Sequence, residues 1–441
     1  MLIAYLVVSV ALIILLTVRL KIHPFIALLL VAIVYGFLAG MPADEIIRSV
    51  NEGFGKTLGG IGLIIILGVI IGAFLENSGG AYAIAERVLK IVGKKRVPLA
   101  MGSMGYVVSI PVFGDSGFLL LSPLNKSLSK KAKISLAGSA IALALGLTAS
   151  HTMVPPTPGP IAAAGILGAD LGMVLMVGVP VSIFALTIGI IFATRIVSKI
   201  QIDPAPEISE EKLAELSKNA PSAMMSCVPV FVPIILIVSK SILKNIDGVG
   251  GPVVDTLMFL GEPFVALFIG VFLSLLLPKK LEAEMLSTTG WVGKALASAA
   301  SIILITGAGG VFGKVLQNSG IAQVMGDALD GYNLGIWLPF LLAAAIKTAQ
   351  GSSTVALITA ASIMAPLMET LGFVTGLDKA MVVVAIGAGS AVVSHANDSF
   401  FWVVTQMTGM DVKTGYRTHS LGTLILGMSA ISALFVVHLL V

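Results

Sequence analysis

The sequence predicts an all-α polytopic membrane protein made of two inverted-topology repeats, each with a re-entrant hairpin and a broken transmembrane helix. Composition, long apolar runs and an internal repeat predict this fold. The 441 residues are 57% hydrophobic and only 11% charged, whereas a soluble chain needs about a quarter of its residues charged. Apolar runs such as Leu2 to Val18 and Leu421 to Val441 are close in length to the about 20 residues that a helix needs to span a bilayer. Transmembrane β-strands would instead alternate apolar and polar residues.

The internal repeat divides the chain into two halves. The segment "LENSGGAYAIAERVL" (75–89) resembles "LQNSGIAQVMGDAL" (316–329). Further matches follow in the same order along both halves: Pro98 with Pro339, Ser150–His151 with Ser394–His395, and Gly168–Asp170 with Gly409–Asp411. We therefore expect repeat 1 over 1–197, a cytoplasmic linker over 198–222, the longest polar stretch, and repeat 2 over 223–441.

Each half has the same predicted order of elements. Three apolar spans come first, then an amphipathic segment, a broken apolar pair, a span with a polar break and a last span. In repeat 1 these are 2–19, 24–40, 58–75, 80–92, 97–130, 134–168 and 173–195. In repeat 2 they are 225–245, 255–277, 295–316, 320–330, 335–368, 379–410 and 419–440. The broken pairs 97–130 and 335–368 are the predicted re-entrant hairpins, because "PVFGDSG" (111–117) and "KTAQGSST" (347–354) interrupt them.

The distribution of positive charge supports this topology. If each hairpin returns to the side it entered, each repeat crosses the membrane five times and the two repeats have opposite orientations. Of the 27 Lys and Arg residues, 20 then fall on one side, which the positive-inside rule makes the cytoplasmic side. Both termini are therefore predicted to lie outside.

Four interruptions bring polar residues to membrane depth, where irregular backbone persists only beside protein or a water-filled cavity. Two are the hairpin tips, and the other two are "TASHTMVPPTPGP" (148–160) and "VVSHANDSFFW" (392–402). Inverted repeats with broken helices are typical of transporters, whose site lies between the repeats. We expect Ser150, His151 and Thr152 to interrupt their helix, and the following prolines to keep it broken.

The residues at these interruptions indicate binding of an anion. Gly351, Ser352, Ser353 and Thr354 precede an apolar run in a composition that leaves helix N-terminal amides open to a carboxylate. Gly114 and Ser116 have the same potential in repeat 1, and Asn397 and Ser399 can bind hydroxyl groups. No Arg occurs at the interruptions, and Lys347 is the nearby cation.

Titratable side chains at the same places are candidates for proton coupling. Asp115 and Asp398 are the stronger ones, because an intramembrane carboxylate is costly and usually functional. His151 and His395 are weaker candidates, since either can simply bond between helices. Single Ser and Thr residues in membrane helices more often bond to their own helix. Asp170 and Asp411 are expected to be helix N-caps, and Glu76 and Gln317 to mark helix C-termini.

Other classes of function find little support. The single Cys227 excludes an internal disulfide and a CxxC metal site. The sequence has no G-x-S-x-G or H-E-x-x-H motif, and its net charge of +4 reports loop position rather than nucleic acid binding. We expect no cofactor, no metal, no nucleic acid partner and no enzymatic activity. An intramembrane enzyme using Ser150 and His151, and a passive channel, are the disfavoured alternatives.

Three motifs give the chain a resemblance to a known family. "GDSG", "SHTMVPPTPGPIAAAGILGADLG" and "SHANDSFFW" resemble the gluconate permease family, within the wider ion-transporter superfamily. The resemblance implies a bacterial inner-membrane, proton-coupled symporter of small hydroxy-carboxylates, commonly dimeric: gluconate or related sugar acids, glycerate, hydroxybutyrate or D-serine. Sodium coupling remains the alternative. The family resemblance places the substrate contacts at Gly114, Asp115, Ser116, Ser150, His151, Thr152, Gly351, Ser352, Ser353, Thr354, Ser394, His395, Asn397, Asp398 and Ser399.

Overall fold

The chain is a bundle of apolar helices. A computed structural model describes residues 1–93, 96–204, 220–244, 246, 250–321, 324 and 334–440, and every element in them is helical. In these residues six helices are long and apolar enough to cross a membrane, and a bent pair would add a seventh. The six spans are Ala43–Asn77, Leu136–Leu167, Leu171–Lys199, Ala223–Lys244, Ala283–Asn318 and Val412–Leu440. The prediction of an all-α polytopic membrane protein is confirmed.

The first half follows the predicted order of elements. Its helices are α1 (Leu2–Ile14), continued by the π-helix η1 (Leu15–Arg19), α2 (Pro24–Leu38), α3 (Ala43–Asn77), α4 (Gly80–Val92), α5 (Val97–Val108), α6 (Gly114–Lys131), α7 (Leu136–Met153), α8 (Pro158–Leu167), α9 (Leu171–Arg195) and η2 (Val197–Lys199). The third span starts much earlier than the expected residue 58. Its polar first turn holds Asp44 and Glu45, whose charges favour a helix N-terminus.

The second half also follows the order, with one correction. Its helices are α11 (Ala223–Lys244), α12 (Pro252–Leu260), α13 (Pro263–Ser274), η3 (Ala283–Leu286), α14 (Trp291–Asn318), α16 (Trp337–Gln350), α17 (Ser353–Met364), η4 (Ala365–Leu367), α18 (Gly376–Ala391), α19 (Ser399–Thr408), α20 (Val412–Gly415), η5 (Tyr416–Ser420) and α21 (Leu421–Leu440). The expected span 255–277 is not one continuous helix, because it consists of α12 and α13, which are bent by 70°. Pro263 at the first position of α13 cannot continue the preceding helix.

Corresponding helices end in the same way in both halves. Helix α3 ends before Gly79 (φ 79°) and α14 before Gly320 (φ 75°), which confirms the helix ends expected at Glu76 and Gln317. Asp170 accepts a hydrogen bond from the Met173 amide at 2.9 Å, and Asp411 one from the Thr414 amide at 2.8 Å. Both are therefore N-caps, as expected.

Hydrogen bonds from the Thr414 side chain and backbone also lower the pKa of the exposed Asp411 carboxyl.

The opposite orientation of the two halves and their division at 198–222 stay predictions. Most of the predicted linker (residues 205–219) and most of the predicted amphipathic segment 320–330 lie outside the described residues.

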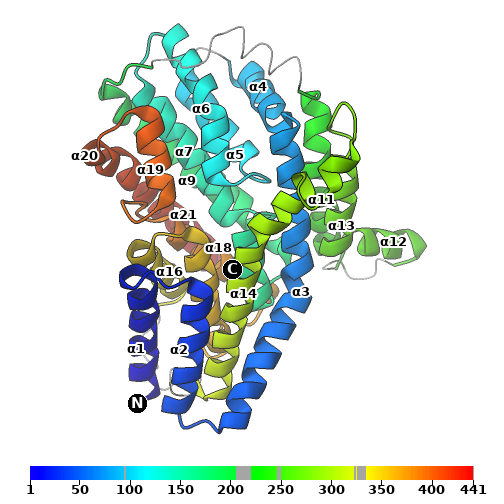
Figure 1. Cartoon of the computed structure of the whole chain (residues 1–441), viewed down its shortest axis with the longest axis vertical. Coiled ribbons are helices and arrows are strands. Elements are labelled where there is room, and N and C mark those ends of the chain that lie inside the picture. The colour runs from blue at the N-terminus through cyan, green and yellow to red at the C-terminus, as the bar shows by residue number, and fades with distance from the viewer. Residues whose placement is uncertain are drawn as a thin grey trace.

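The long helices α3 and α14 lie side by side through the bundle (Figure 1). A Cβ atom added to Gly53 of α3 would lie 2.6 Å from the Gly310 carbonyl oxygen and 2.8 Å from the Val311 Cα atom of α14. At Gly55, on the same helix, an added Cβ meets nothing within 4 Å. The two helices are thus in backbone contact at Gly53 only because that residue lacks a side chain.

This contact gives a first prediction. Gly53→Ala should destabilise the protein by about 1–3 kcal/mol, because the backbones of α3 and α14 must separate. Gly55→Ala should be neutral or slightly stabilising, since alanine favours a helix by about 0.5–1 kcal/mol over glycine. Thermal unfolding of both variants in detergent is the measurement. Equal melting temperatures would contradict the close approach.

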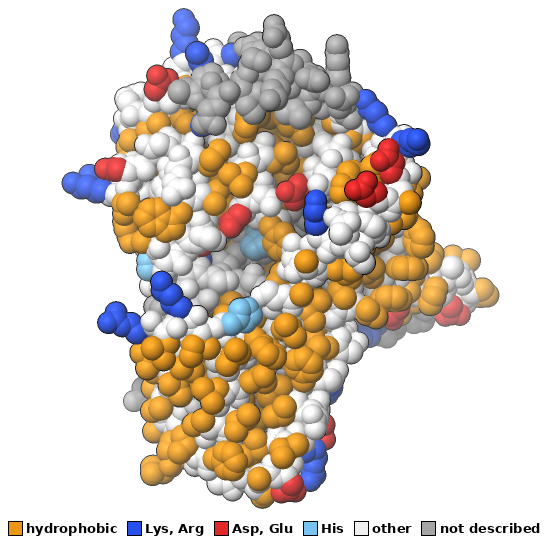
Figure 2. Space-filling model, in the orientation of Figure 1, with side chains coloured by type: hydrophobic (Ala, Val, Ile, Leu, Met, Phe, Trp, Pro, Cys, Tyr) orange, Lys and Arg blue, Asp and Glu red, His pale blue; other side chains and the backbone are white. Residues whose placement is uncertain are grey.

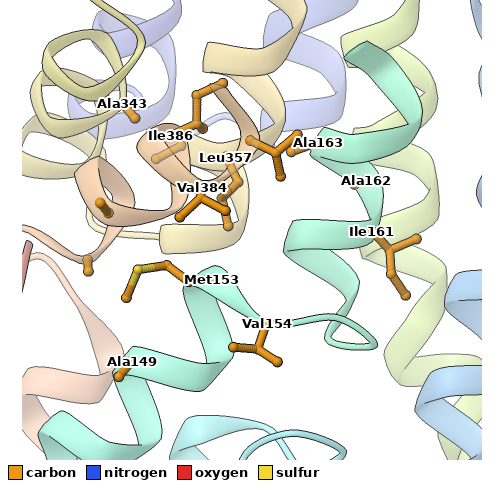
Figure 3. Close-up of a cluster of buried hydrophobic side chains, with 14 of the residues drawn as sticks. Ala149, Met153, Val154, Ile161, Ala162, Ala163, Ala343, Leu357, Val384 and Ile386 are labelled. Carbon is orange, nitrogen blue, oxygen red and sulfur yellow. The ribbon is translucent and has the colours of Figure 1, made fainter. Parts of the chain in front are cut away.

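Apolar packing holds the break between α7 and α8 in place. Figure 3 shows Met153 at this break, below Leu357 of α17 and Val384 of α18, with Val154 beside it. These four side chains are at most 1% exposed. Burying an aliphatic side chain that would otherwise face water stabilises a protein by about 1.5–3 kcal/mol. For helices in a bilayer, close van der Waals packing makes the main contribution instead. The break of one half is therefore fixed against helices of the other.

Candidate functional site

A cavity of about 590 Å³ lies where the interrupted elements meet. Figure 2 shows a hollow on the face where α6 and α19 lie above α16 in Figure 1. The cavity is lined by Phe113, Gly114, Asp115, Ser116, Thr148, His151, Thr152, Lys347, Gln350, Gly351, Ser352, Ser353, Thr354, Ala391, Ser394, Asn397, Asp398, Ser399 and Phe400. Both halves of the chain contribute, and most of the lining side chains are polar.

Most of the residues predicted for the site line this cavity. Gly114, Asp115, Ser116, His151, Thr152, Gly351, Ser352, Ser353, Thr354, Ser394, Asn397, Asp398 and Ser399 do so. Ser150 and His395 are not among the lining residues. Ser150 is fully buried in α7, and its hydroxyl has no hydrogen-bond partner. The Nε2 atom of His395 lies 2.7 Å from the Thr348 carbonyl oxygen.

The helix carrying Ser150 and His151 breaks later than expected. Helix α7 runs through Ser150, His151 and Thr152 to Met153, and the Thr152 hydroxyl bonds to the Thr148 carbonyl oxygen at 2.9 Å. The break begins at Val154, because a residue before proline avoids the helical conformation and Pro155 has no amide to donate. The expectation that Ser150–Thr152 themselves interrupt the helix is therefore wrong. They form its last turn.

Three helices begin at the cavity and present their N-terminal ends to it. Helix α6 starts at Gly114 without a side-chain cap. Helix α17 starts after Ser352, whose hydroxyl accepts from the Val355 amide at 3.3 Å. Helix α19 starts after Asp398, which accepts from the Phe400 amide at 3.0 Å. Free N-terminal amides and the helix dipole favour an anion at such ends.

A buried ion pair belongs to the lining of the cavity. The Lys347 Nζ atom lies 2.6 Å from Asp398 Oδ2, and the two side chains are only 2% and 10% exposed. Lys347 also donates to the Gly351 carbonyl oxygen, which ties the end of α16 to the hairpin turn. The Ser394 hydroxyl donates to the same Asp398 oxygen at 2.5 Å. Every charged group in this cluster therefore has close partners.

Asp115 joins the two halves at the cavity wall. The Ser399 hydroxyl donates to Asp115 Oδ2 at 3.1 Å, although the residues are 284 positions apart. Phe118 and Phe400 pack edge to face beside them, with ring centroids 6.0 Å apart. The start of α6 in the first half is thus held against the start of α19 in the second.

Three histidines surround this cluster in different ways. His151 faces the cavity, and its buried Nδ1 atom has no hydrogen-bond partner. His395 lies outside the cavity lining and stacks on Tyr416, with the two ring centroids 6.3 Å apart. His419 is fully buried in η5, with Nε2 3.0 Å from the Ser394 hydroxyl oxygen. The two Ser-His pairs of the repeat thus have different surroundings.

Some lining and supporting residues have little or no signal in the sequence. Phe113, Thr148, Gln350, Ala391 and Phe400 line the cavity, but each is a common residue in or beside an apolar helix. Lys347 is nearby in sequence, yet its burial in an ion pair had no sequence signal. His419 lies at the start of the last span, in the π-helical turn η5, and its contact with Ser394 joins residues 25 positions apart.

The described residues contain no group of three or more His, Cys, Asp or Glu side chains placed to hold a metal ion. The cavity instead combines one cation, two carboxylates, hydroxyl groups, side-chain amides and the N-terminal ends of three helices, of which α6 has no side-chain cap. Such a set suits a small molecule that carries both a carboxylate and hydroxyl groups.

Comparison with known proteins places the chain in a family. Residues 1–440 match the GntP family permease model. The chain is 35% identical to the gluconate permease of Pseudomonas aeruginosa, over 94% of this chain and 92% of that protein. It is 31% identical to the Gnt-II system L-idonate transporter of Escherichia coli, over 96% of this chain and 98% of that protein.

A solved structure shares the fold. MtrF of Neisseria gonorrhoeae, described as one of a class of antimetabolite efflux pumps, aligns with a TM-score of 0.67 and 14% sequence identity over 96% of both chains. At that identity the likeness concerns the fold alone. The match to the family model over nearly the whole length, together with the relatives above 30% identity, shows that this multi-pass membrane protein belongs to the GntP family of permeases.

Proposed function

We propose that this protein is a secondary active transporter that imports gluconate or a related sugar acid by proton symport across the bacterial inner membrane. The observation that carries the proposal is the cavity between the two halves. It offers Lys347 and the uncapped N-terminus of α6 to a carboxylate. It also offers Ser116, Asn397 and Ser399 to hydroxyl groups. Relatives named for gluconate and L-idonate transport support the substrate class.

Glycerate, hydroxybutyrate and D-serine are smaller candidate substrates, and sodium is the alternative coupling ion. We further propose that the protein is a homodimer and that both termini of each chain lie outside the membrane on the periplasmic side. An intramembrane enzyme is disfavoured, because Ser150 does not line the cavity that holds His151. A channel is disfavoured because the cavity lies between interrupted elements of both halves.

Counterflow in proteoliposomes tests the transporter and its substrate together. Vesicles loaded with unlabelled gluconate should transiently concentrate external labelled gluconate, which a channel cannot do. Unlabelled L-idonate, glycerate, hydroxybutyrate and D-serine, added outside one at a time, then rank the substrates by competition. Absence of counterflow with every loaded acid would contradict the proposal.

A second prediction concerns the proton. Asp398→Asn should impair proton-driven accumulation much more than exchange, because exchange needs no net proton movement. The matched control is Asp170→Asn, since asparagine is an equally good N-cap and Asp170 lies outside the cavity lining. Accumulation and exchange of labelled gluconate are measured in the same vesicles. Equal loss of both activities would mean that Asp398 binds substrate or supports the fold instead.

A further inference from the structure

We propose that Lys347 binds the substrate carboxylate and that Asp398 is its internal competitor, which releases Lys347 only when it takes up the coupled proton. This inference rests on the proposed function. The inference adds a role for the proton: protonation of Asp398 breaks its ion pair with Lys347, which makes the Lys347 ammonium available to the substrate. It also fixes the charge that moves with the substrate.

The burial of the pair is the first step. A lysine ammonium that is 2% exposed needs an anion beside it. Of the two carboxylates lining the cavity, Asp398 contacts Lys347 at 2.6 Å, while Asp115 accepts from Ser399 at 3.1 Å. Asp398 therefore occupies the position beside Lys347 that a substrate carboxylate would take.

The second step is competition for one cation. Two carboxylates beside a single buried ammonium repel each other, so both cannot stay ionised. Protonation of Asp398 removes its negative charge. Lys347 then keeps a counter-anion only if the substrate carboxylate arrives. The proton and the substrate thus bind together, and neither occupies the site favourably alone.

The surroundings of Asp398 keep its carboxyl group in place during this exchange. Ser394 donates to Asp398 at 2.5 Å and lies 3.0 Å from His419 Nε2. Because the Ser394 hydroxyl hydrogen points to the carboxylate, His419 donates from Nε2 and its buried Nδ1 is left as an acceptor. His419 is thus a positioning residue for Ser394.

The charged and titratable groups that face Asp398 come from four elements. They are Lys347 on α16, Asp115 on α6, His151 on α7 and His419 on η5. Asp115 is the group most able to substitute for Asp398 as proton acceptor, so the experiment must separate the two.

The charge of the site follows directly. The empty site holds one ammonium and one carboxylate from the pair. The loaded site holds the same ammonium, the substrate carboxylate and a neutral Asp398 carboxylic acid. The pair and its ligands therefore have the same net charge in both states, and one proton crosses with each monocarboxylate. Transport is electroneutral.

Calorimetry of gluconate binding to the purified wild-type protein tests the proton exchange. Titrations in buffers of different ionisation enthalpy should show uptake of close to one proton per gluconate bound. Apparent affinity should fall by up to about tenfold for each unit rise in pH, as expected for one linked proton. Asp398→Asn should take up close to no proton and bind gluconate with a flat pH profile. Asp170→Asn should behave as wild type.

Vesicles test the charge. A pH gradient alone should drive accumulation of gluconate, and an interior-negative membrane potential alone should drive none. Accumulation driven by the potential, or loss of proton uptake in Asp115→Asn rather than in Asp398→Asn, would overturn this inference while leaving gluconate transport standing. Failure of the wild type to bind or exchange gluconate would instead overturn the proposed function.

Discussion

Replacing Lys347 with methionine should abolish gluconate transport and lower the free energy of unfolding by about 3–5 kcal/mol, because it leaves Asp398 as a buried carboxylate without its cation. The double variant Lys347→Met with Asp398→Asn should recover most of that stability, since it removes the second charge as well. It should not recover transport, because no cation remains for the substrate carboxylate.

The matched control for this prediction is Lys240→Met. Lys240 Nζ lies 2.6 Å from Glu262 Oε1, the same distance as in the Lys347 pair, but the Glu262 side chain is 51% exposed. Loss of such a pair costs about 0–1 kcal/mol. Chemical or thermal unfolding of all four proteins and uptake of labelled gluconate are the measurements. A stable, transporting Lys347→Met variant would refute the role of the buried pair.

Replacing Gly351 with alanine should have the second large effect: a loss of about 2–5 kcal/mol in stability, from about 1–2 for the left-handed backbone and about 1–3 for the close contact, and of at least tenfold in transport. Gly351 has φ +94°, and an added Cβ atom would lie 2.3 Å from the Asn397 carbonyl oxygen. The turn between α16 and α17 would have to move away from the segment before α19. Because Lys347 donates to the Gly351 carbonyl oxygen, that movement would displace the cation as well.

Gly409→Ala separates this effect from backbone strain alone. Gly409 also has a positive φ, +71°, but an added Cβ there meets nothing within 4 Å. It should cost only about 1–2 kcal/mol from the left-handed conformation and leave transport near the wild-type rate. Equal transport by the two alanine variants would show that the contact between Gly351 and Asn397 does not matter for the site.

The sequence predicts the interruptions well where one residue forces the backbone. Gly351 ends α16, and Ser352 caps α17 inside the predicted tip 347–354. The tip of the first hairpin, by contrast, breaks at 109–113, and Gly114 to Gly117 form the first turn of α6. Glycine and serine suit a first helical turn as well as a loop, so the local pattern does not separate the two.

The missing parts of the prediction depend on contacts distant in sequence. Lys347 and Asp398 meet across 51 residues, and Asp115 meets Ser399 from the other half of the chain. Composition and spacing place each residue near a break, but they do not pair side chains across helices. The bend at Pro263 has only the short local signal of Gly261 and Glu262 before the proline, and the long apolar runs on either side predict one span instead.

The most direct test of the central claim is proton-driven uptake by purified protein in liposomes. An inward proton gradient should drive accumulation of labelled gluconate, and a protonophore should abolish it. A sodium gradient at equal pH should drive none. Accumulation that follows the sodium gradient and ignores the proton gradient would contradict the account: the site would still bind a carboxylate, but protonation of Asp398 would not be what couples it.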